Sequence, residues 1–238
     1  MHTEVFADAE STARAAAKLI AGDIRTVAAE RGRYSLAVSG GRTPWLMLRA
    51  LADEDVAWER LYIVQVDERV APAGHPDRNL THLEKTLLRH APLRPEQIHS
   101  MPVESNDLER AAAQYASSLR EIAGSPPVLD LVHLGLGPDG HTASLVPGDP
   151  ILDVNEKDVG VTGVYLGRRR MTLTYPAINR ARRILWVVTG SDKAEMLPRL
   201  LKGDTSIPAG RVKADSATVF ADRAAAGDRS QNVQSEVA

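Results

Sequence analysis

The chain has 238 residues, with 29 Lys and Arg against 31 Asp and Glu, which gives a formal net charge of -2 at pH 7. A net charge this close to zero gives no sign of the basic surface that nucleic-acid binding requires. An aromatic content of 4% argues against a stacking platform for single-stranded nucleic acid. The absence of Cys excludes disulfides, thiolate metal sites and a cysteine nucleophile. The N-terminus carries acids where a signal peptide carries bases, and no apolar run approaches the roughly 18 residues of a membrane span. We therefore expect a cytoplasmic protein that binds neither nucleic acid nor membranes.

A helix followed by a buried strand is predicted at the start of the chain. Apolar residues recur at helical spacing over residues 8–31, and Gly32 is placed to end this helix. Tyr34–Val38 is a short apolar run, typical of a strand that is buried on both faces. Thr43 and Pro44 then have the character of an N-cap and a first helical position, which predicts the start of a second helix.

The same alternation continues along the chain. Asn106 and Glu109 match a capping box at the start of one helix, and Pro198 predicts a kink in another. Strands that alternate with helices predict a single α/β domain over residues 1–224, with a mainly parallel sheet and helices on both faces. The polar tail over 225–238 is expected to be disordered. The further strands are expected over 61–66, 97–101, 129–134 and 183–188, and the further helices over 79–89, 106–122 and 192–201.

Three loops that follow predicted strands are candidates for a ligand site, because open α/β sheets bind ligands at the carboxyl ends of their strands. The first is Ser39-Gly40-Gly41-Arg42-Thr43-Pro44. Glycines allow backbone N–H groups to approach an anion closely, and a helix N-terminus favours negative charge. An ordinary strand-to-helix turn explains this loop equally well when it is taken alone.

The second and third loops carry groups suited to acid–base chemistry. Asp67, Glu68 and Arg69 follow the strand over 61–66, although a solvated strand end with a surface ion pair is the simpler interpretation of these three alone. The third loop, Leu134–Gly148, holds Asp139 and His141 within a glycine-rich stretch that leads into an expected helix start. A carboxylate two residues away fixes an imidazole tautomer, so His141 is a candidate general base.

Taken together, these strings resemble the 6-phosphogluconolactonase family, within the wider group that includes glucosamine-6-phosphate deaminases. The order and spacing match from about residue 5 to residue 222. In HPDRNL, Arg78 occupies a position where a small residue is more usual in the family. The matching strings are SGGRTP (39–44), VDERV (66–70), HPDRNL (75–80), LGLGPDGHTASLVPG (134–148), RMTLT (170–174) and GSDKA (190–194).

The resemblance implies hydrolysis of 6-phosphoglucono-δ-lactone to 6-phosphogluconate, the second step of the oxidative pentose phosphate pathway, on a Rossmann-like α/β fold without an organic cofactor. It further implies that His141 is the catalytic base, that Asp139 belongs to the same motif, and that Asp67 lies where the deaminases have a proton-transfer aspartate. The implied substrate-binding residues are Ser39, Gly40, Gly41, Arg42 and Thr43 of the phosphate loop, together with Arg69, Arg170 and Lys193. No covalent nucleophile is evident, because Ser39 lacks the G-x-S-x-G context.

Alternatives from other classes remain open at this stage. A glucosamine-6-phosphate deaminase or isomerase would carry a Glu at the position of Val146, and Tyr rather than Arg69 after the Asp-Glu pair. A phosphosugar-sensing regulator domain would need a DNA-binding segment and a basic face. The histidines, among them His75 and His82, lack a recognised metal-binding spacing, so no metal is expected. We expect a monomer, with a homodimer as the alternative, acting on a phosphorylated sugar lactone.

Overall fold

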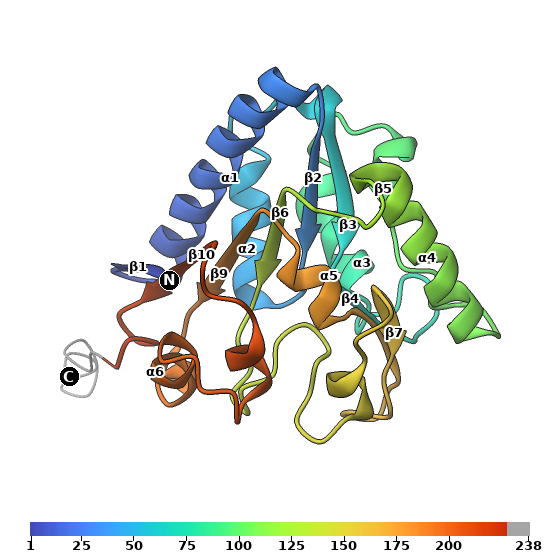
Figure 1. Ribbon diagram of the computed structural model, residues 1–238. Helices are drawn as coiled ribbons and strands as arrows, with labels where there is room; N and C mark the ends of the chain where they lie inside the picture. The colour runs from blue at the N-terminus through green and yellow to red at the C-terminus, as the bar shows by residue number, and fades with distance from the viewer. Residues whose placement is uncertain (228–238) are drawn as a thin grey trace.

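A computed structural model describes residues 1–227 of the chain, and its centre is a parallel sheet (Figure 1). The sheet has 7 strands in the order β1-β10-β9-β6-β2-β3-β5, and each neighbouring pair is parallel. This confirms the predicted α/β class. The strands are β1 (His2–Phe6), β2 (Tyr34–Val38), β3 (Leu61–Gln65), β5 (Ile98–His99), β6 (Leu131–Leu134), β9 (Arg183–Val188) and β10 (Ala217–Asp222).

Helices cover both faces of this sheet, as predicted, and each face has its own apolar core. One core contains side chains of α1 (Ala9–Arg31), α2 (Arg42–Leu51) and α3 (Asn79–Leu83). The other contains side chains of α4 (Leu108–Ala123), α5 (Tyr175–Asn179) and α6 (Met196–Leu201). Figure 1 shows α1 and α2 together on one side of the sheet and α4 on the other.

A second, smaller sheet was not predicted from the sequence. It has 3 strands in the order β4-β8-β7, formed by β4 (Asp67–Arg69), β8 (Arg170–Leu173) and β7 (Val159–Val161), and both pairings are antiparallel. Strands this short show no readable alternation, and their partners are distant in sequence. The sheet lies beyond the carboxyl ends of the central strands, near the lower edge of Figure 1.

Strands β2 and β6 are neighbours at the point where the chain reverses its direction of travel across the central sheet. From β2 the chain continues outward through β3 and β5, whereas from β6 it continues through β9 and β10 in the opposite direction. Such a switch point leaves a crevice at the strand ends, because the connections depart to opposite sides. The loops after β2 and β6 are the predicted phosphate loop and the loop of His141.

Several local predictions near helix ends were wrong. Helix α2 begins at Arg42 with Gly41 as its N-cap, and Thr43 makes no capping bond because its hydroxyl pairs with the Thr189 hydroxyl. No helix starts after His141, where residues 142–149 instead form successive turns.

Two further predictions, in α4 and α6, also need correction. Asp107, not Asn106, caps α4 by accepting a hydrogen bond from the Arg110 N–H. The expected helix over 192–201 is divided, so that Pro198 lies in the first turn of α6, where its missing N–H costs nothing.

The predicted tail lies mostly outside the described residues, from 228 onward. Within the described part of it, Ala225 is buried, and its N–H donates to Asp222. No helix in residues 1–227 has the length and apolar character needed to cross a membrane.

Candidate active site

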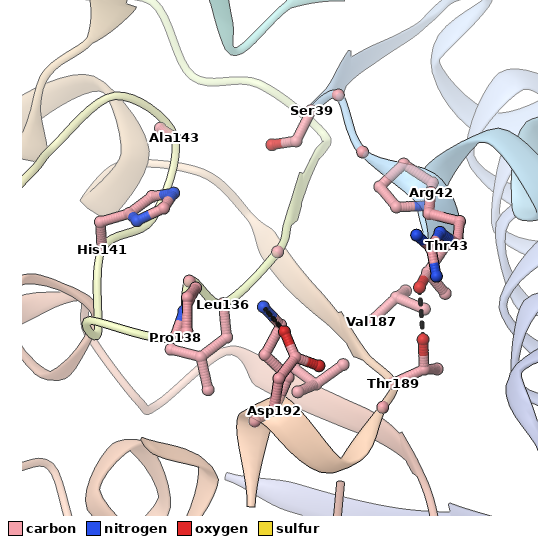
Figure 2. Close-up of a pocket in the computed structure, with 18 of the residues that line it drawn as sticks. Ser39, Arg42, Thr43, Leu136, Pro138, His141, Ala143, Val187, Thr189 and Asp192 are labelled. Atoms are coloured by element: carbon pink, nitrogen blue, oxygen red, sulfur yellow. Dashed lines mark hydrogen bonds and ion pairs between the residues drawn. The ribbon is translucent and has the colours of Figure 1, made fainter. Parts of the chain in front are cut away.

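The three predicted loops converge on one cavity of about 660 Å³ at the switch point. Figure 2 shows His141 on one side of this cavity, and Arg42 and Thr43 on the opposite side. Asp139 is the single predicted site residue that does not line the wall, and it lies against His141 instead. The predicted residues that line the cavity are Ser39, Gly40, Gly41, Arg42, Thr43, Asp67, Arg69, His141, Arg170 and Lys193.

His141 and Asp139 form a hydrogen-bonded pair. The Asp139 carboxylate has its Oδ1 2.5 Å from His141 Nδ1, and the same oxygen accepts from the His141 backbone N–H at 3.2 Å. The hydrogen bond from His141 holds the pKa of Asp139 well below its usual range. An ionised Asp139 therefore faces Nδ1, which places the imidazole hydrogen on that nitrogen and leaves Nε2 as the basic one.

Glycines in this loop make room for the pair. A Cβ on Gly137 would lie 2.1 Å from His141 Nδ1 and 2.7 Å from Asp139 Oδ1, far inside contact distance. Gly140 has φ of 80°, a left-handed conformation that glycine adopts without steric cost. The glycine-rich composition of the loop thus serves the placement of the imidazole rather than mere flexibility.

The predicted phosphate loop (39–44) is held in place by hydrogen bonds to a fully buried histidine. The Ser39 N–H donates to His133 Nδ1 at 3.3 Å, and the Ser39 hydroxyl donates to the His133 carbonyl at 2.9 Å. Burial lowers the pKa of His133 to about 3, so its imidazole is neutral and can accept. Ser39 is 4% exposed, and the glycines after it line the cavity beside it.

The first turn of α2 opens onto the cavity without a side-chain cap. Gly41 is the N-cap residue, with φ of 129°, and no side chain satisfies the first N–H groups of the helix. Unsatisfied N–H groups at a helix N-terminus, together with the helix dipole, favour an anion. Lys193 lines the same cavity and pairs with Asp192 at 2.7 Å.

Two arginines of the second sheet form the other cationic part of the cavity. Arg69 of β4 and Arg170 of β8 are direct partners in the antiparallel register. Burial lowers the pKa of Arg170, and Arg69 lowers it further, whereas Asp67 opposes both effects. The Nε atoms of both arginines are buried without a hydrogen-bond partner among the described residues. The arrangement concentrates positive charge where a small anion can enter.

Asp67 and Asn79 connect Arg69 to the neighbouring elements. Asp67 is 4% exposed, and its Oδ2 accepts from the Ser144 hydroxyl at 2.7 Å. The Asn79 amide donates to the Asp67 carbonyl at 2.9 Å, and Asn79 Oδ1 accepts from Arg69 Nη1 at 2.7 Å. A Cβ on Gly40 would lie 1.9 Å from the same Oδ1, so the phosphate loop packs directly against Asn79.

Comparison with known proteins agrees with this geometry. Residues 7–221 match the family described as Glucosamine-6-phosphate isomerases/6-phosphogluconolactonase. The chain belongs to this family.

Several similar proteins of known name are 6-phosphogluconolactonases. A 6-phosphogluconolactonase of Synechocystis sp. is 39% identical over 173 residues, which is 71% of this chain and 72% of that protein. One of Streptomyces coelicolor is 36% identical over 222 residues, covering 86% of this chain and 84% of the relative. The crystal structure of 6-phosphogluconolactonase from Thermotoga maritima superposes with a TM-score of 0.82 at 26% identity, covering 93% of this chain and 98% of that chain.

Arg78, the departure from the family pattern, is compensated by a buried carboxylate. Arg78 is 3% exposed, and its Nε lies 3.3 Å from Oε2 of Glu68, which is itself fully buried. Glu68 also accepts from the backbone N–H groups of Arg69, Asn79 and Leu80. A buried ion pair persists when further hydrogen bonds satisfy its remaining groups. The pair joins β4 to the start of α3.

The recognised strings contain the residues of the cavity wall, but the contacts that hold these residues in place were not evident from the sequence. Glu68, Asn79 and Ser144 lie within recognised strings, and their chemical roles depend on partners that are far away in the chain. Tyr165 lies outside every string, and no sequence signal indicated it. The family resemblance therefore identified the residues of the cavity wall, but not the contacts that hold these residues in place.

The two histidines considered as metal ligands have other contacts. His82 stacks on Trp45 with ring centroids 5.2 Å apart, and its Nε2 lies 2.8 Å from the Pro76 carbonyl. His75 Nε2 is 3.2 Å from Arg168 Nη2. Within residues 1–227, no cluster of three His, Asp or Glu side chains has the geometry to hold a metal ion.

Proposed function

We propose that this protein hydrolyses 6-phosphoglucono-δ-lactone to 6-phosphogluconate, the second step of the oxidative pentose phosphate pathway. The observation that carries the proposal is the His141–Asp139 pair facing a cavity whose other walls carry the N-terminus of α2 and several cationic side chains. The lactonases of Synechocystis and Streptomyces coelicolor support the same activity.

His141 is the general base in this proposal. Its Nε2 takes a proton from water as the water oxygen bonds to the lactone carbonyl carbon, and Asp139 stabilises the imidazolium that forms. The bond from the carbonyl carbon to the ring oxygen then breaks, and the imidazolium returns the proton to the leaving oxygen. Such base catalysis contributes about 10²–10⁴-fold. A lactone is an activated ester, so water and a base suffice without a covalent nucleophile.

The phosphate group anchors the substrate away from the reacting carbonyl. Gly40, Gly41 and Thr43 supply the phosphate loop at the start of α2, and Lys193 and Arg170 supply charge. Ionised donors make the stronger hydrogen bonds to an anion, and anchoring contributes orientation. Arg42 lines the same side of the cavity, and Ser39 holds the loop in place through His133.

Asp67 and Arg69 complete the wall between base and anchor. Asp67 lies among the cations, where it limits the repulsion around Arg170 and offers a carboxylate to the sugar hydroxyls. Arg69 places a second guanidinium beside Arg170. No step requires an organic cofactor or a metal.

A comparison of the phosphorylated with the unphosphorylated lactone tests the anchoring residues. Lys193→Ala should raise the KM for 6-phosphogluconolactone while the weak hydrolysis of unphosphorylated glucono-δ-lactone is unchanged. Equal losses on both lactones would contradict the assignment of Lys193 to the phosphate.

Glucosamine-6-phosphate deamination is the alternative within the same fold. A monomeric glucosamine-6-phosphate deaminase superposes with a TM-score of 0.83 at 22% identity, a likeness that shows the fold alone. Val146 is buried and occupies the position at which the deaminase reaction needs a carboxylate. Incubation with glucosamine 6-phosphate should release no ammonia, and ammonia release at a rate comparable to lactone hydrolysis would favour the deaminase.

A further inference from the structure

Tyr165 contacts three groups of the site although it lies outside every recognised motif. Its hydroxyl donates to Asp139 Oδ2 at 2.9 Å. Its ring meets the His141 imidazole edge to face, with centroids 5.6 Å apart and an interplanar angle of 67°. The Arg170 guanidinium carbon lies 4.9 Å from the centroid of the same ring. One side chain thus joins the general base to a cation of the binding pocket.

The position of Tyr165 is fixed by a tight turn between β7 and β8. The Tyr165 N–H donates to the Arg168 carbonyl at 2.9 Å, and the Arg168 N–H donates back at 3.3 Å. The two residues between them, Leu166 and Gly167, have φ of 50° and 78°. Positive φ at both central residues is the geometry of a two-residue hairpin turn that matches strand twist. Arg168 Nε in turn donates to Asp77 Oδ2 at 2.6 Å, which ties the turn to the loop before α3.

The hydroxyl of Tyr165 gives the second oxygen of the Asp139 carboxylate a hydrogen-bond donor. Asp139 Oδ1 faces His141 and Oδ2 faces Tyr165, so both oxygens are held and the carboxylate cannot rotate away from the imidazole. Burial and the neighbouring Asp139 raise the pKa of Tyr165, so its hydroxyl keeps its proton at neutral pH. The charged or titratable groups that face Tyr165 are Asp139, His141 and Arg170, and Arg170 has Arg69 and Asp67 beside it.

The ring of Tyr165 supports Arg170. The Arg170 side chain makes no hydrogen bond to another described residue, and its buried Nε is without a partner. A guanidinium over an aromatic face is held by the negative charge of the ring quadrupole. This contact leaves the hydrogen-bonding edge of Arg170 available to a ligand in the cavity that it lines.

We propose that Tyr165 is a positioning residue for lactone hydrolysis, orienting His141 through its hydroxyl and Asp139, and orienting Arg170 through its ring. The proposal rests on the function assigned above. The two contributions are separable, because Phe keeps the ring and loses only the hydroxyl, whereas Leu loses both.

The hydroxyl contribution should appear in kcat and in the pH profile. Tyr165→Phe should lower kcat about tenfold, part of the roughly 10²–10⁴-fold due to the base, with KM within about twofold of wild type. Asp139 without its second donor is a stronger acceptor for the imidazolium form of His141. The acidic limb of kcat/KM should therefore move to higher pH, measured from about pH 5 to about pH 8.

The ring contribution should appear in KM. Tyr165→Leu should show the kcat loss of Tyr165→Phe and, in addition, a KM for 6-phosphogluconolactone raised about tenfold, the loss expected for a contact of this kind near a desolvated cation. Val164→Ala is the matched control, since Val164 is in the same hairpin and is 73% exposed, and it should leave both constants unchanged.

Freshly generated 6-phosphogluconolactone, with spontaneous hydrolysis subtracted, serves as substrate for Tyr165→Phe, Tyr165→Leu, Val164→Ala and His141→Ala. A shifted acidic limb in Tyr165→Phe and a KM effect confined to Tyr165→Leu support the proposal. The proposal is overturned if the acidic limb of kcat/KM is unshifted in Tyr165→Phe and if Tyr165→Phe and Tyr165→Leu have equal KM. This holds even if both variants are slow, because poorer folding alone would lower the rate without either effect. If His141→Ala retains wild-type turnover, the proposed general base itself fails, and this result is distinguishable from failure of the Tyr165 proposal alone.

Discussion

Arg69 and Arg170 lie directly opposite each other on β4 and β8, and their guanidinium groups share one cavity wall. Like charges at directly opposite positions of an antiparallel pair are unfavourable, so the folded protein bears an electrostatic cost here. In the proposed function, an anionic substrate relieves that cost on binding. The pair therefore couples stability to function in a way that can be measured.

Replacing Arg170 should weaken binding without weakening the fold, whereas Arg69 also holds Asn79 Oδ1 and the Asp77 carbonyl through its Nη1. Arg170→Met keeps the apolar stem and removes the charge, so the KM for 6-phosphogluconolactone should rise at least tenfold. The melting temperature should stay the same or rise, because the repulsion with Arg69 is gone. Steady-state kinetics and thermal unfolding of Arg170→Met test this. A melting temperature lowered by more than about 4 °C in this variant would show that Arg170 is structural.

Gly137 should tolerate no side chain, in contrast to a glycine two residues earlier. A Cβ at Gly137 would overlap the His141 imidazole, whereas a Cβ at Gly135 meets nothing within 4 Å. Gly137→Ala should displace His141 from Asp139 and lower kcat by about 10²-fold or more. Gly135→Ala, in the same loop and cavity wall, should retain nearly full activity. Equal activities of the two variants would show that the imidazole is not held as described.

The buried His133 should make the stability of the folded protein sensitive to acid. Its pKa is about 3 when buried against an ordinary value of 6.5, so between these two pH values the unfolded chain binds more protons than the folded one. The free energy of unfolding should therefore decrease as the pH falls from about 6.5 towards 3, by up to about 1.4 kcal/mol per pH unit.

Urea denaturation across that pH range measures the effect. His133→Asn keeps an acceptor for the Ser39 N–H and cannot titrate, so its stability should vary less steeply with pH than that of the wild type. Parallel stability curves for the two proteins would assign the acid sensitivity to other groups.

Activity should survive removal of metal ions. In the proposed function, the base and the cationic wall are protein side chains, and no step uses a Lewis acid. Dialysis against EDTA should leave kcat and KM unchanged on 6-phosphogluconolactone. Loss of activity that is restored by an added divalent cation would require a different mechanism.

The central sheet and the His141 loop were predictable because their signals are local. Buried strands such as Tyr34–Val38 are continuous apolar runs, and the glycines around Asp139 and His141 are adjacent in sequence. The helix ends were less predictable, since Thr43 has capping propensity, yet the hydroxyl of Thr189, the residue after β9, takes its hydroxyl. Tertiary partners override propensity wherever they offer a competing hydrogen bond.

The supporting residues were not predictable for a related reason. The pairing of Arg69 with Arg170 depends on two short strands that come together only in the folded chain. Tyr165 reaches Asp139 through a hairpin turn that contains Leu166 at positive φ, a residue with no turn preference. Residues that hold a site from a distant segment leave no pattern in a single sequence.

The rate of hydrolysis of fresh 6-phosphogluconolactone by His141→Ala, after subtraction of the spontaneous reaction, tests the central claim most directly. His90→Ala is the control, because His90 is an exposed histidine outside the cavity. The general-base account predicts a loss of kcat of about 10²-fold or more in His141→Ala, with 6-phosphogluconate still bound, and no loss in His90→Ala. Turnover by His141→Ala close to that of the wild type would contradict the account.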